Sequence, residues 1–495
     1  MFSISLSSPG GSTWLPPSPL AWTVERMSWR AVGGPWTARL RADAPRLNTL
    51  WQLAEGLGYG LTLFDAREAA WWGYLSAVEL HAQGQVVRLS LEGMANQVAV
   101  AYHERTPNAW AGPRQQSAWA ADSGSIARYG AKQRVFALDS AGADAASAAA
   151  YAATLLRRYA GPQITTLAGA GTELYAVVEA RGWWERLDWR FYSDPRGLEG
   201  HQSGGSVAVG VGGQPAAARV AQSFRLATAE GWTADEVWLK LRRNHAADTL
   251  LLEVRDGESS APGETCLARA SLPAAQISEE LAWTRFALDA PVALQPGRTA
   301  WLVLSRSGAI DPDGFVQVAA DEDAGYPRGD LRLWNGSAWT ARAPDADLHF
   351  QALGGEETSA QAAHLLGEAD CLRGARIETP SGIQSRVYRD GTRRARAEIE
   401  ALLQGGTASG QRLLARVTPE RVAVVYAQPA GEQAALALSP GGQITRLDGR
   451  ILAPSEQPAG QWARLGALTA PGAAPNLLFI ESCAWDGRGI HLSRD

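Results

Sequence analysis

The chain has 495 residues, of which 46% are hydrophobic and 20% are charged, and its formal net charge is -5. This length exceeds one ordinary hydrophobic core, so we expect more than one domain. The near-neutral charge, without any Lys/Arg block, excludes a broad nucleic-acid-binding surface. The three cysteines are odd in number and far apart, which argues against a disulfide framework or a cysteine-based zinc site.

The N-terminal stretch MFSISLSSPGGSTWLPPSPLAW has no charged segment followed by an apolar one, so we expect no secretory signal peptide. No run approaches the roughly 18 apolar residues of a membrane-spanning helix, so we expect no membrane span. Synthesis in the cytoplasm is therefore expected, with release by lysis or as part of a particle.

Residues 1–200 are expected to mix helices and strands. Apolar residues recur at helical spacing over 47–57, and Gly58 provides a stop. Two alternating runs joined at Gln83-Gly84 predict a β-hairpin. The alanine-rich stretch AGADAASAAAYAATLLRRYAG predicts a second helix, and strand-like TELYAVVEARGWW follows.

The middle of the chain has a different pattern. The glycine-rich stretch 201–219 is expected to be a linker. Residues 220–353 contain six or more short alternating strands separated by Gly, Pro and Asp turns, which predicts a β-sandwich. Residues 354–495 return to mixed helices and strands. The predicted fold class is β-rich α+β, in which one scaffold is interrupted by an inserted β-sandwich.

The stretch LRLWNGSAWTARAPDADLHF predicts a hairpin at the end of this sandwich. Asn335-Gly336 is a strong hairpin signal because both residues tolerate the positive φ of a type I′ turn. With a two-residue turn, Arg332 lies opposite Trp339, and Trp334 lies diagonally to Trp339 on the same face. The leucines then point to the core, and the tryptophans point away from it.

The same arrangement is predicted on two other strands of the sandwich. Alternation places Trp238 and Trp283 on the face away from the core, beside basic residues. One interpretation is an aromatic surface that stacks on sugar rings. The other, which we favour, is contact with arginine stems, a neighbouring domain or another subunit. The candidate binding residues are Trp238, Trp283, Arg332, Trp334 and Trp339.

Two acidic stretches are candidates for a calcium site or for paired catalytic carboxylates. Their spacing does not meet the EF-hand order, and aspartates also fill such loops by forming caps and turns. We favour the turn interpretation. The carboxylates are Asp311, Asp313, Asp321 and Asp323, with Asp345 and Asp347 in the later stretch.

The common catalytic motifs are missing from the sequence. There is no HExxH, no G-x-x-x-x-G-K-[ST], no G-x-G-x-x-G that opens a helix, and no G-x-S-x-G. The seven histidines are scattered singly. We therefore expect a protein that is not an enzyme and that takes no metal and no other cofactor.

Several stretches together resemble tail proteins of long-tailed bacteriophages. They are WWGYLSAVEL…VVRLSLEGMANQVAVAYHE, DSGSIARYGAKQRVFAL and RGWWERLDWRFY, followed by LLQGGTASGQRLLARVTPERVAVVY and LDGRILAPSEQPAGQWARL. The resemblance covers roughly two-thirds of the chain and points to a structural role. The interrupted middle is similar to jelly-roll modules that resemble carbohydrate-binding modules.

The resemblance implies a hub-type protein of the tail tip or baseplate, located in the virion. Such hubs carry β-barrel domains and are often trimers, so a homo-oligomer, favouring a trimer, is expected. The implied partners are other tail proteins, namely tube, distal tail, fibre or tape-measure proteins, with a host-surface glycan as a further ligand. The alternatives are a secreted or virion-associated glycan-binding protein, or a glycan-degrading enzyme with an accessory binding module.

Overall fold

The computed structural model divides into two compact units. The scaffold comprises Met1–Tyr192, Thr358–Ile383 and Thr392–Asp495, and the sandwich comprises Ser193–Glu357 and Gln384–Gly391. The structure describes residues 2–9, 11–14, 20–104, 114–138, 143–169, 171–202, 207–322, 325–342, 346–431, 434–439, 441–465 and 477–493.

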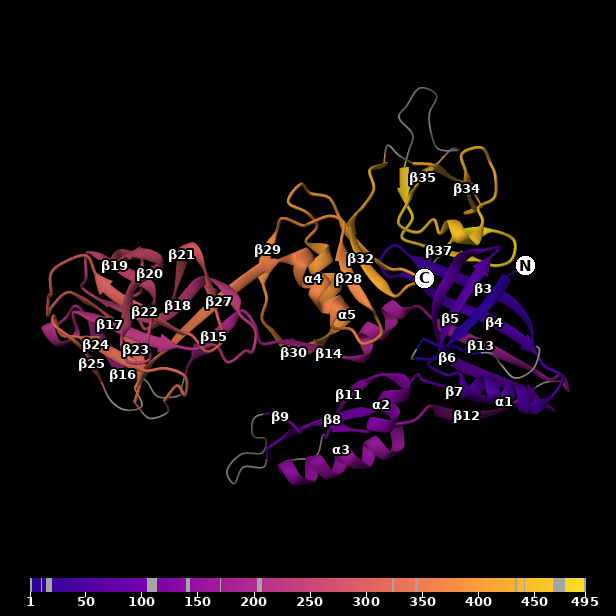
Figure 1. Cartoon of the computed structure of the whole chain (residues 1–495), viewed down its shortest axis with the longest axis horizontal. Coiled ribbons are helices and arrows are strands. Elements are labelled where there is room, and N and C mark those ends of the chain that lie inside the picture. Colours follow the sequence, from indigo (N-terminus) through magenta and orange to yellow (C-terminus); the bar gives the residue numbers. More distant parts are fainter. Residues whose placement is uncertain are drawn as a thin grey trace. The chain divides into compact units, whose positions relative to one another are not determined.

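The predicted β-rich α+β class is confirmed. Strands account for 52% of the chain and helices for 15%, in several antiparallel sheets that include a curled half-barrel (Figure 1). The helices expected from apolar spacing and alanine content form as α1 (Leu47–Glu55) and α3 (Ala145–Tyr159). Asp144 caps α3 through its side chain, which accepts the Ser147 N–H at 2.6 Å.

The largest sheet of the scaffold has eleven strands among the described residues, and its main path runs β2-β1-β5-β6-β13-β4-β3-β37-β38. A branch from β6 continues through β7 to β12. The strands are β1 (Phe2–Ser7), β2 (Thr13–Trp14), β3 (Ala21–Arg30), β4 (Gly34–Asp43), β5 (Gly60–Asp65), β6 (Glu68–Ala82), β7 (Gln85–Ser90), β12 (Gln163–Ala168), β13 (Tyr175–Arg181), β37 (Ser482–Trp485) and β38 (Ile490–Leu492).

Smaller sheets complete the scaffold. One contains β8 (Gln97–His103), β9 (Arg114–Gln116), β10 (Ala120–Ala121) and β11 (Gln133–Ala137), and α3 packs on β8. A second contains β28 (Gly374–Ile377), β31 (Leu413–Val417) and β32 (Val422–Ala427), beside α4 (Thr358–Gly367) and α5 (Ala395–Gln404). A third contains β33 (Leu436–Leu438), β34 (Ile444–Arg446), β35 (Trp462–Leu465) and β36 (Leu477–Phe479). The remaining helices are α2 (Ser123–Tyr129) and the 3-10 turns η1 (Trp183–Trp189) and η5 (Pro454–Glu456).

The scaffold segments on either side of the sandwich share one hydrophobic core. Leu40 and Trp71 from the first segment pack in the same cluster as Ile399 and Ala415 from the last. Strand β3 pairs with β37 in antiparallel register. The Trp72 indole N–H donates to the Val417 carbonyl at 2.9 Å. Neither segment therefore completes its core without the other.

Three stretches of the first scaffold segment, around Asn96, Gly130 and Arg186, pack against each other. The Asn96 amide donates to Ser125 Oγ at 3.1 Å and to the Gly130 carbonyl at 2.9 Å, which fixes the end of α2. Arg186 of η1 donates to the Tyr129 carbonyl at 2.6 Å. Gly130 has φ +83°, and a Cβ there would lie 1.9 Å from Arg186 Nη2. The Arg186 tip could move away, but the φ of +83° is a backbone conformation that L side chains rarely adopt, so glycine is favoured here.

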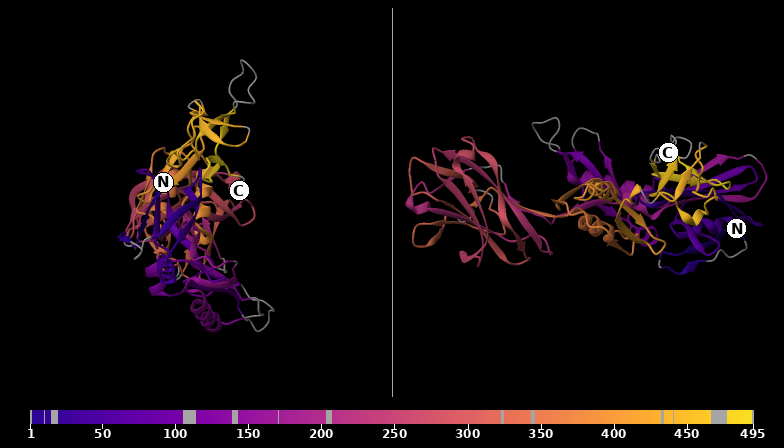
Figure 2. Two further views of the ribbon diagram at one scale, coloured as in Figure 1. Left: turned by 90° about the vertical axis from the view of Figure 1, so that its right-hand side faces the viewer. Right: turned by 90° about the horizontal axis from the view of Figure 1, so that it is seen from above.

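The sandwich has two sheets with a hydrophobic core between them (Figures 1 and 2). The larger sheet contains β15 (Leu198–His201), β16 (Val207–Val211), β18 (Trp232–Asn244), β21 (Ala282–Leu294), β23 (Phe315–Asp321), β26 (Asp347–Leu348), β27 (Phe350–Glu357) and β29 (Gln384–Arg386). The smaller runs β20 (Pro262–Pro273), β19 (Thr249–Gly257), β22 (Thr299–Arg306), β17 (Arg219–Phe224), β24 (Leu331–Trp334) and β25 (Trp339–Ala341). Two 3-10 turns, η2 (Pro215–Ala217) and η3 (Ala274–Gln276), lie between strands.

The stretch 201–219 does not behave as a linker where the structure describes it. Val207–Val211 forms β16 and pairs with β23 from Val207↔Ala320 to Val211↔Val316. Val209 and Val211 are buried in the sandwich core. The glycine content suggested flexibility, but alternate valines give this strand an apolar face that the core buries.

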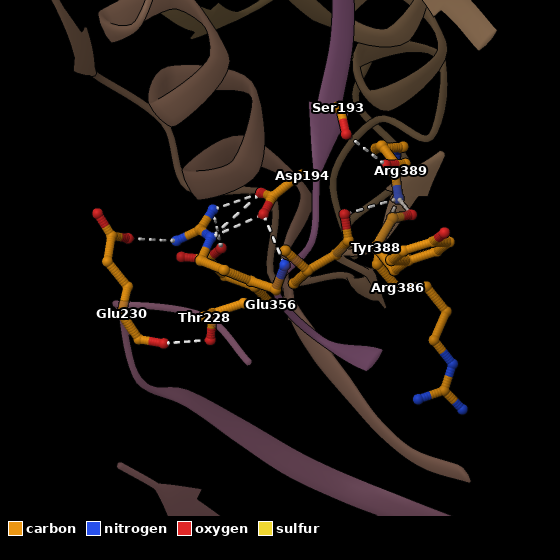
Figure 3. A network of polar contacts seen from close by, with 10 residues as sticks. Ser193, Asp194, Thr228, Glu230, Glu356, Arg386, Tyr388 and Arg389 are labelled. Carbon is orange, nitrogen blue, oxygen red and sulfur yellow. Dashed lines mark hydrogen bonds and ion pairs between the residues drawn. The ribbon is translucent and has the colours of Figure 1, made fainter. Parts of the chain in front are cut away.

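A polar network fixes the ends of the sandwich segments (Figure 3). Arg196 Nη2 donates to the buried Asp194 carboxylate at 2.7 Å, and the same guanidinium lies 3.8 Å from Glu230 and 3.9 Å from Glu356. Arg389 Nη1 donates to three successive carbonyls, those of Arg386, Val387 and Tyr388. Two further strands, β14 (Phe191–Asp194) and β30 (Arg389–Arg394), pair with each other beside this network.

Replacing Gly130 by alanine is expected to destabilise the scaffold by about 2 kcal/mol or more, because the new Cβ meets Arg186 and the positive φ is strained. Urea unfolding followed by circular dichroism measures this. Gly161→Ala is the matched control, since a Cβ there meets nothing within 4 Å. Equal unfolding midpoints for the two variants would contradict the close packing of α2 on η1.

Candidate functional site

Trp238 and Trp283 lie on the outer face of the larger sheet, as alternation predicted. Val237 and Leu239 are buried in the sandwich core, so Trp238 between them points away from it. Trp238 pairs with Arg285 across β18 and β21, and Trp283 pairs with Lys240. Both tryptophans are half-buried.

A buried carboxylate organises this outer face. Glu236 accepts the Trp238 indole N–H at 3.0 Å and forms ion pairs with Arg285 and Arg386. Burial alone would raise the pKa of Glu236, but the hydrogen bonds from Arg285 and Trp238 outweigh it and leave the pKa lowered. The Trp238 N–H and both guanidinium groups are thus already engaged within the sandwich.

The hairpin residues Arg332, Trp334 and Trp339 belong to the smaller sheet instead. Leu331 and Leu333 of β24 pack in or against the sandwich core, so Arg332 and Trp334 face outward from the smaller sheet. The prediction that all four tryptophans form one outward surface is therefore wrong. The two sheets enclose the core, so the candidates divide between two opposite faces of the sandwich.

The hairpin register also differs from the predicted one. Trp334 is directly opposite Trp339, and Arg332 is opposite Ala341. The Asn335 side chain accepts the backbone N–H groups of Ser337 and Ala338 at 3.0 and 2.9 Å, which stabilises a four-residue loop in place of the two-residue turn. The tryptophan rings consequently lie side by side, with centroids 5.4 Å apart at 54°.

A small second cluster lies under one of these rings. Ala221, Trp301 and Val303 are buried on the outer side of the smaller sheet, and Trp339 packs against them. The Trp301 indole N–H donates to the Glu258 carbonyl at 2.9 Å. Trp339 therefore covers apolar surface, whereas Trp334 is a half-buried ring at the edge of the cluster.

Arg332 lies beside this tryptophan pair. It forms an ion pair with Asp330 at 3.6 Å, and its buried Nε has no hydrogen-bond partner within the described part of the chain. This Nε is shielded from solvent, whereas the Arg332 side chain as a whole is 23% exposed next to the two aromatic rings. This combination of aromatic rings and arginine is typical of residues that contribute most to protein interfaces.

The acidic candidates separate into turn residues and buried residues. Asp311 and Asp313 are exposed in a loop, where Asp311 accepts the Asp313 N–H at 2.9 Å, in agreement with the turn interpretation. Asp321 is different, because it lies on β23 and is only 1% exposed. Asp323 and Asp345 lie outside the described residues. The turn interpretation is therefore wrong for Asp321.

Asp321 belongs to a buried cluster at one end of the larger sheet. It forms an ion pair with His201 of β15, and His349 Nε2 lies 3.9 Å from the same carboxylate oxygen. Its neighbour across β23 and β26 is Asp347, which is 2% exposed. Asp347 accepts hydrogen bonds from Gln222 Nε2 and the Tyr326 N–H, both at 2.6 Å.

This cluster joins residues far apart in the sequence. Desolvation raises the pKa of Asp347 to about 6, against the two hydrogen bonds it accepts. Sequence reasoning missed His201, Gln222 and His349, because single histidines and a glutamine within apolar strands give no local signal. Among the described residues, no group of three or more His, Cys, Asp and Glu is arranged to hold a metal ion.

The scaffold has a buried cation that the sequence analysis also missed. Lys132 Nζ donates to the Leu91 carbonyl at 2.6 Å and lies 4.8 Å from the Trp189 ring. Burial lowers the pKa of Lys132 to about 8. A cavity of about 70 Å³ beside it is also lined by Glu179 and Glu185, and this is too small for more than a few water molecules. We interpret the group as structural.

A larger groove of about 370 Å³ lies where the two scaffold segments meet. Trp72 and Arg416 line it, and the Arg416 guanidinium lies 5.3 Å from the Tyr426 ring. The Gln457 amide reaches across to the Ala69 carbonyl at 3.3 Å. These contacts hold the segments together. No helix in the described residues is long and apolar enough to cross a membrane.

Comparisons with known proteins give no family. No family model and no curated protein match the sequence. A clostridial cysteine protease, Cwp84 after propeptide cleavage, is a similar solved structure at 10% identity and TM-score 0.23, covering 68% of this chain and 71% of that one. An arabinoxylan arabinofuranohydrolase of glycoside hydrolase family 43 from Bacillus subtilis has 10% identity, 62% and 65% coverage and TM-score 0.14. Infectious bursal disease virus, Gx strain, has 11% identity, 70% and 84% coverage and TM-score 0.13.

The sandwich is expected to lose stability as the pH rises from about 4 to about 6. Asp347 has a pKa of about 6 when folded, against an ordinary value of 3.8, so the folded state binds more protons in this range. The contribution of Asp347 to the free energy of unfolding is fully present below about pH 4 and is lost above about pH 6. The difference between these two limits is about 3 kcal/mol. Urea unfolding of wild type and of Asp347→Asn at about pH 4 and about pH 6 measures the part of the pH dependence that Asp347 causes.

The control for this measurement is Asp311→Asn, which changes an exposed turn carboxylate. This control is expected to keep the wild-type pH dependence. If Asp347→Asn also keeps it, Asp347 is not the group that titrates.

Trp339→Ala is expected to cost the sandwich about 2 kcal/mol, because the ring covers Trp301 and Val303. Trp334→Ala, which removes a neighbouring ring outside this cluster, is expected to cost less than about 1 kcal/mol. Thermal unfolding of the two variants measures the difference. The reverse order would show that Trp334 is the ring that stabilises the sheet.

Proposed function

We propose that the chain is a structural component of a bacteriophage tail tip or baseplate, a hub-type protein whose sandwich contacts neighbouring tail proteins. The observation that carries the proposal is the single core shared by residues 1–192 and the later scaffold segments 358–383 and 392–495. An inserted domain that leaves such a core intact adds a contact surface to a subunit of an assembly without disrupting the fold of that subunit. The sequence resemblance supplies the identity of the assembly.

In this proposal the contact surface is the outer face of the smaller sheet around Trp334 and Arg332. The rings of Trp334 and Trp339 form a continuous aromatic surface, and the half-buried Arg332 side chain lies beside it. The corresponding groups on the larger sheet are engaged by Glu236. The smaller sheet is therefore the better candidate for a protein neighbour. Partners are tube, distal tail, fibre or tape-measure proteins, and the subunit is a homo-oligomer, with a trimer favoured.

A second candidate function is binding of a host-surface glycan by the same face. The specific observation in its favour is the pair of adjacent indole rings 5.4 Å apart, which suits stacking on a sugar ring. In both proposals the chain acts by binding and takes no cofactor. The two functions differ in the ligand that the same residues recognise, so one set of variants tests both.

Trp334→Ala is expected to weaken binding of the full-length chain to its tail-protein neighbours by about tenfold or more, because interface tryptophans contribute strongly to affinity. Co-purified tail proteins and surface plasmon resonance provide the measurement. Trp283→Ala is the matched control, since it removes a half-buried tryptophan from the opposite sheet. This control is expected to bind as wild type does.

The same pair of variants on a glycan array separates the two functions. If Trp334→Ala loses glycan binding but keeps protein binding, the ligand of this face is a sugar and not a tail protein. A chain that is absent from purified tails and binds none of their proteins would overturn the proposed role in the virion.

A further inference from the structure

We propose that strand β12 is the docking edge for a second copy of this chain, which adds a strand to the eleven-stranded sheet. The inference rests on the proposed homo-oligomeric function and assigns a two-fold contact between chains, which is distinct from the contacts that would close a trimer. Among the described strands, β12 pairs with β7 alone, so its other edge is unpaired. Unpaired edges are sites at which another strand can add.

The side chains of β12 are unusually exposed for their chemistry. Ile164 is 66% exposed and Leu167 is 58% exposed, the two highest values among the exposed large hydrophobic residues in the described part of the chain. Five of the six residues of β12 are exposed. Transferring apolar surface from water contributes about 25 cal/mol per Å², so a partner that covers these side chains gains free energy.

A row of apolar side chains crosses the sheet and ends at this edge. Val178 faces Val78 across β13 and β6, Val78 faces Leu89 across β6 and β7, and Leu89 faces Ile164 across β7 and β12. Val178 and Val78 are 1% and 0% exposed, Leu89 is half-buried and Ile164 is 66% exposed. The side chains that cover this row inside the scaffold thus do not cover Ile164. A further strand paired with β12 would continue the row of apolar side chains.

Strand β12 itself lacks the charges, prolines and bulges that usually protect edge strands from pairing, although Pro162 directly precedes it. The sequence contains no charged residue between Arg158 and Glu173, and β12 itself contains no proline. Its register with β7 is regular, with no bulge from Gln163↔Ser90 to Ala168↔Gln85. Natural edges are usually blocked by lysine, proline or bulges. This edge is therefore suited to strand addition.

A second copy is the occupant that the chemistry of β12 favours. The sequence QITTLA offers no charge for a partner to recognise, so recognition depends on backbone hydrogen bonds and on threonine and aliphatic side chains. An identical strand running antiparallel supplies the same groups in return and places threonine against threonine at the centre. Threonine pairs and β-branched pairs are among the favourable cross-strand contacts.

The test is Ile164→Lys in the full-length chain. A lysine at this exposed position leaves the scaffold folded but places a charge at the edge, so self-association is expected to weaken by about tenfold or more. Multi-angle light scattering over a range of concentrations measures the mass. Ile451→Lys is the matched control, because Ile451 is 56% exposed on another part of the scaffold. The control is expected to keep the wild-type mass.

Hydrogen exchange locates the contact directly. The amides of β12 are expected to gain protection as wild-type concentration rises, and to exchange rapidly at all concentrations in Ile164→Lys. Rapid exchange of β12 in a stable wild-type oligomer, or an Ile164→Lys oligomer of unchanged mass, would overturn the inference while leaving the proposed function intact. A monomeric chain would also overturn the inference, whereas the proposed function fails separately, when purified tails lack the chain.

Discussion

The structure depends on one constraint, which is that the scaffold core needs residues from both sides of the sandwich. Trp72 from the first segment donates its indole N–H to the Val417 carbonyl, and β37 completes the sheet beside β3. The segments are separated by the whole sandwich in sequence, so their core forms only after the chain has passed through the insertion and returned at Thr358. Loop-closure entropy grows slowly with length, and an insertion of this size is therefore compatible with a stable scaffold.

Tryptophan is the residue that best separates structure from function in this chain. Of the 20 tryptophans, Trp29, Trp71, Trp184 and Trp301 are among the largest fully buried side chains. Trp29 and Trp301 satisfy their indole N–H groups with the Ala70 and Glu258 carbonyls, which removes the cost of burying a donor. Tryptophan abundance by itself therefore reports core packing. The candidate binding surface we propose is marked by a narrower feature, which is the pair of adjacent, half-buried rings on one sheet face beside Arg332.

The sandwich combines two kinds of surface with a buried polar cluster. Glu236 engages the donors of the larger sheet internally, whereas Trp334 and Arg332 are half-buried on the outer face of the smaller sheet. The buried Asp347, which lies opposite Asp321, makes stability depend on proton binding between about pH 4 and about pH 6.

The sequence by itself determined the elements whose signals are local. Apolar spacing gave α1, alternation placed Trp238 away from the core, and the hairpin around Asn335 formed where it was expected. Only the tertiary structure decided the hairpin register, because the Asn335 side chain stabilises a longer loop than its sequence pair suggests. It also brought His201 to Asp321 across 120 positions. Periodicity reports the face on which a side chain lies, but which faces meet depends on strand pairing between distant segments and on the core that they bury together.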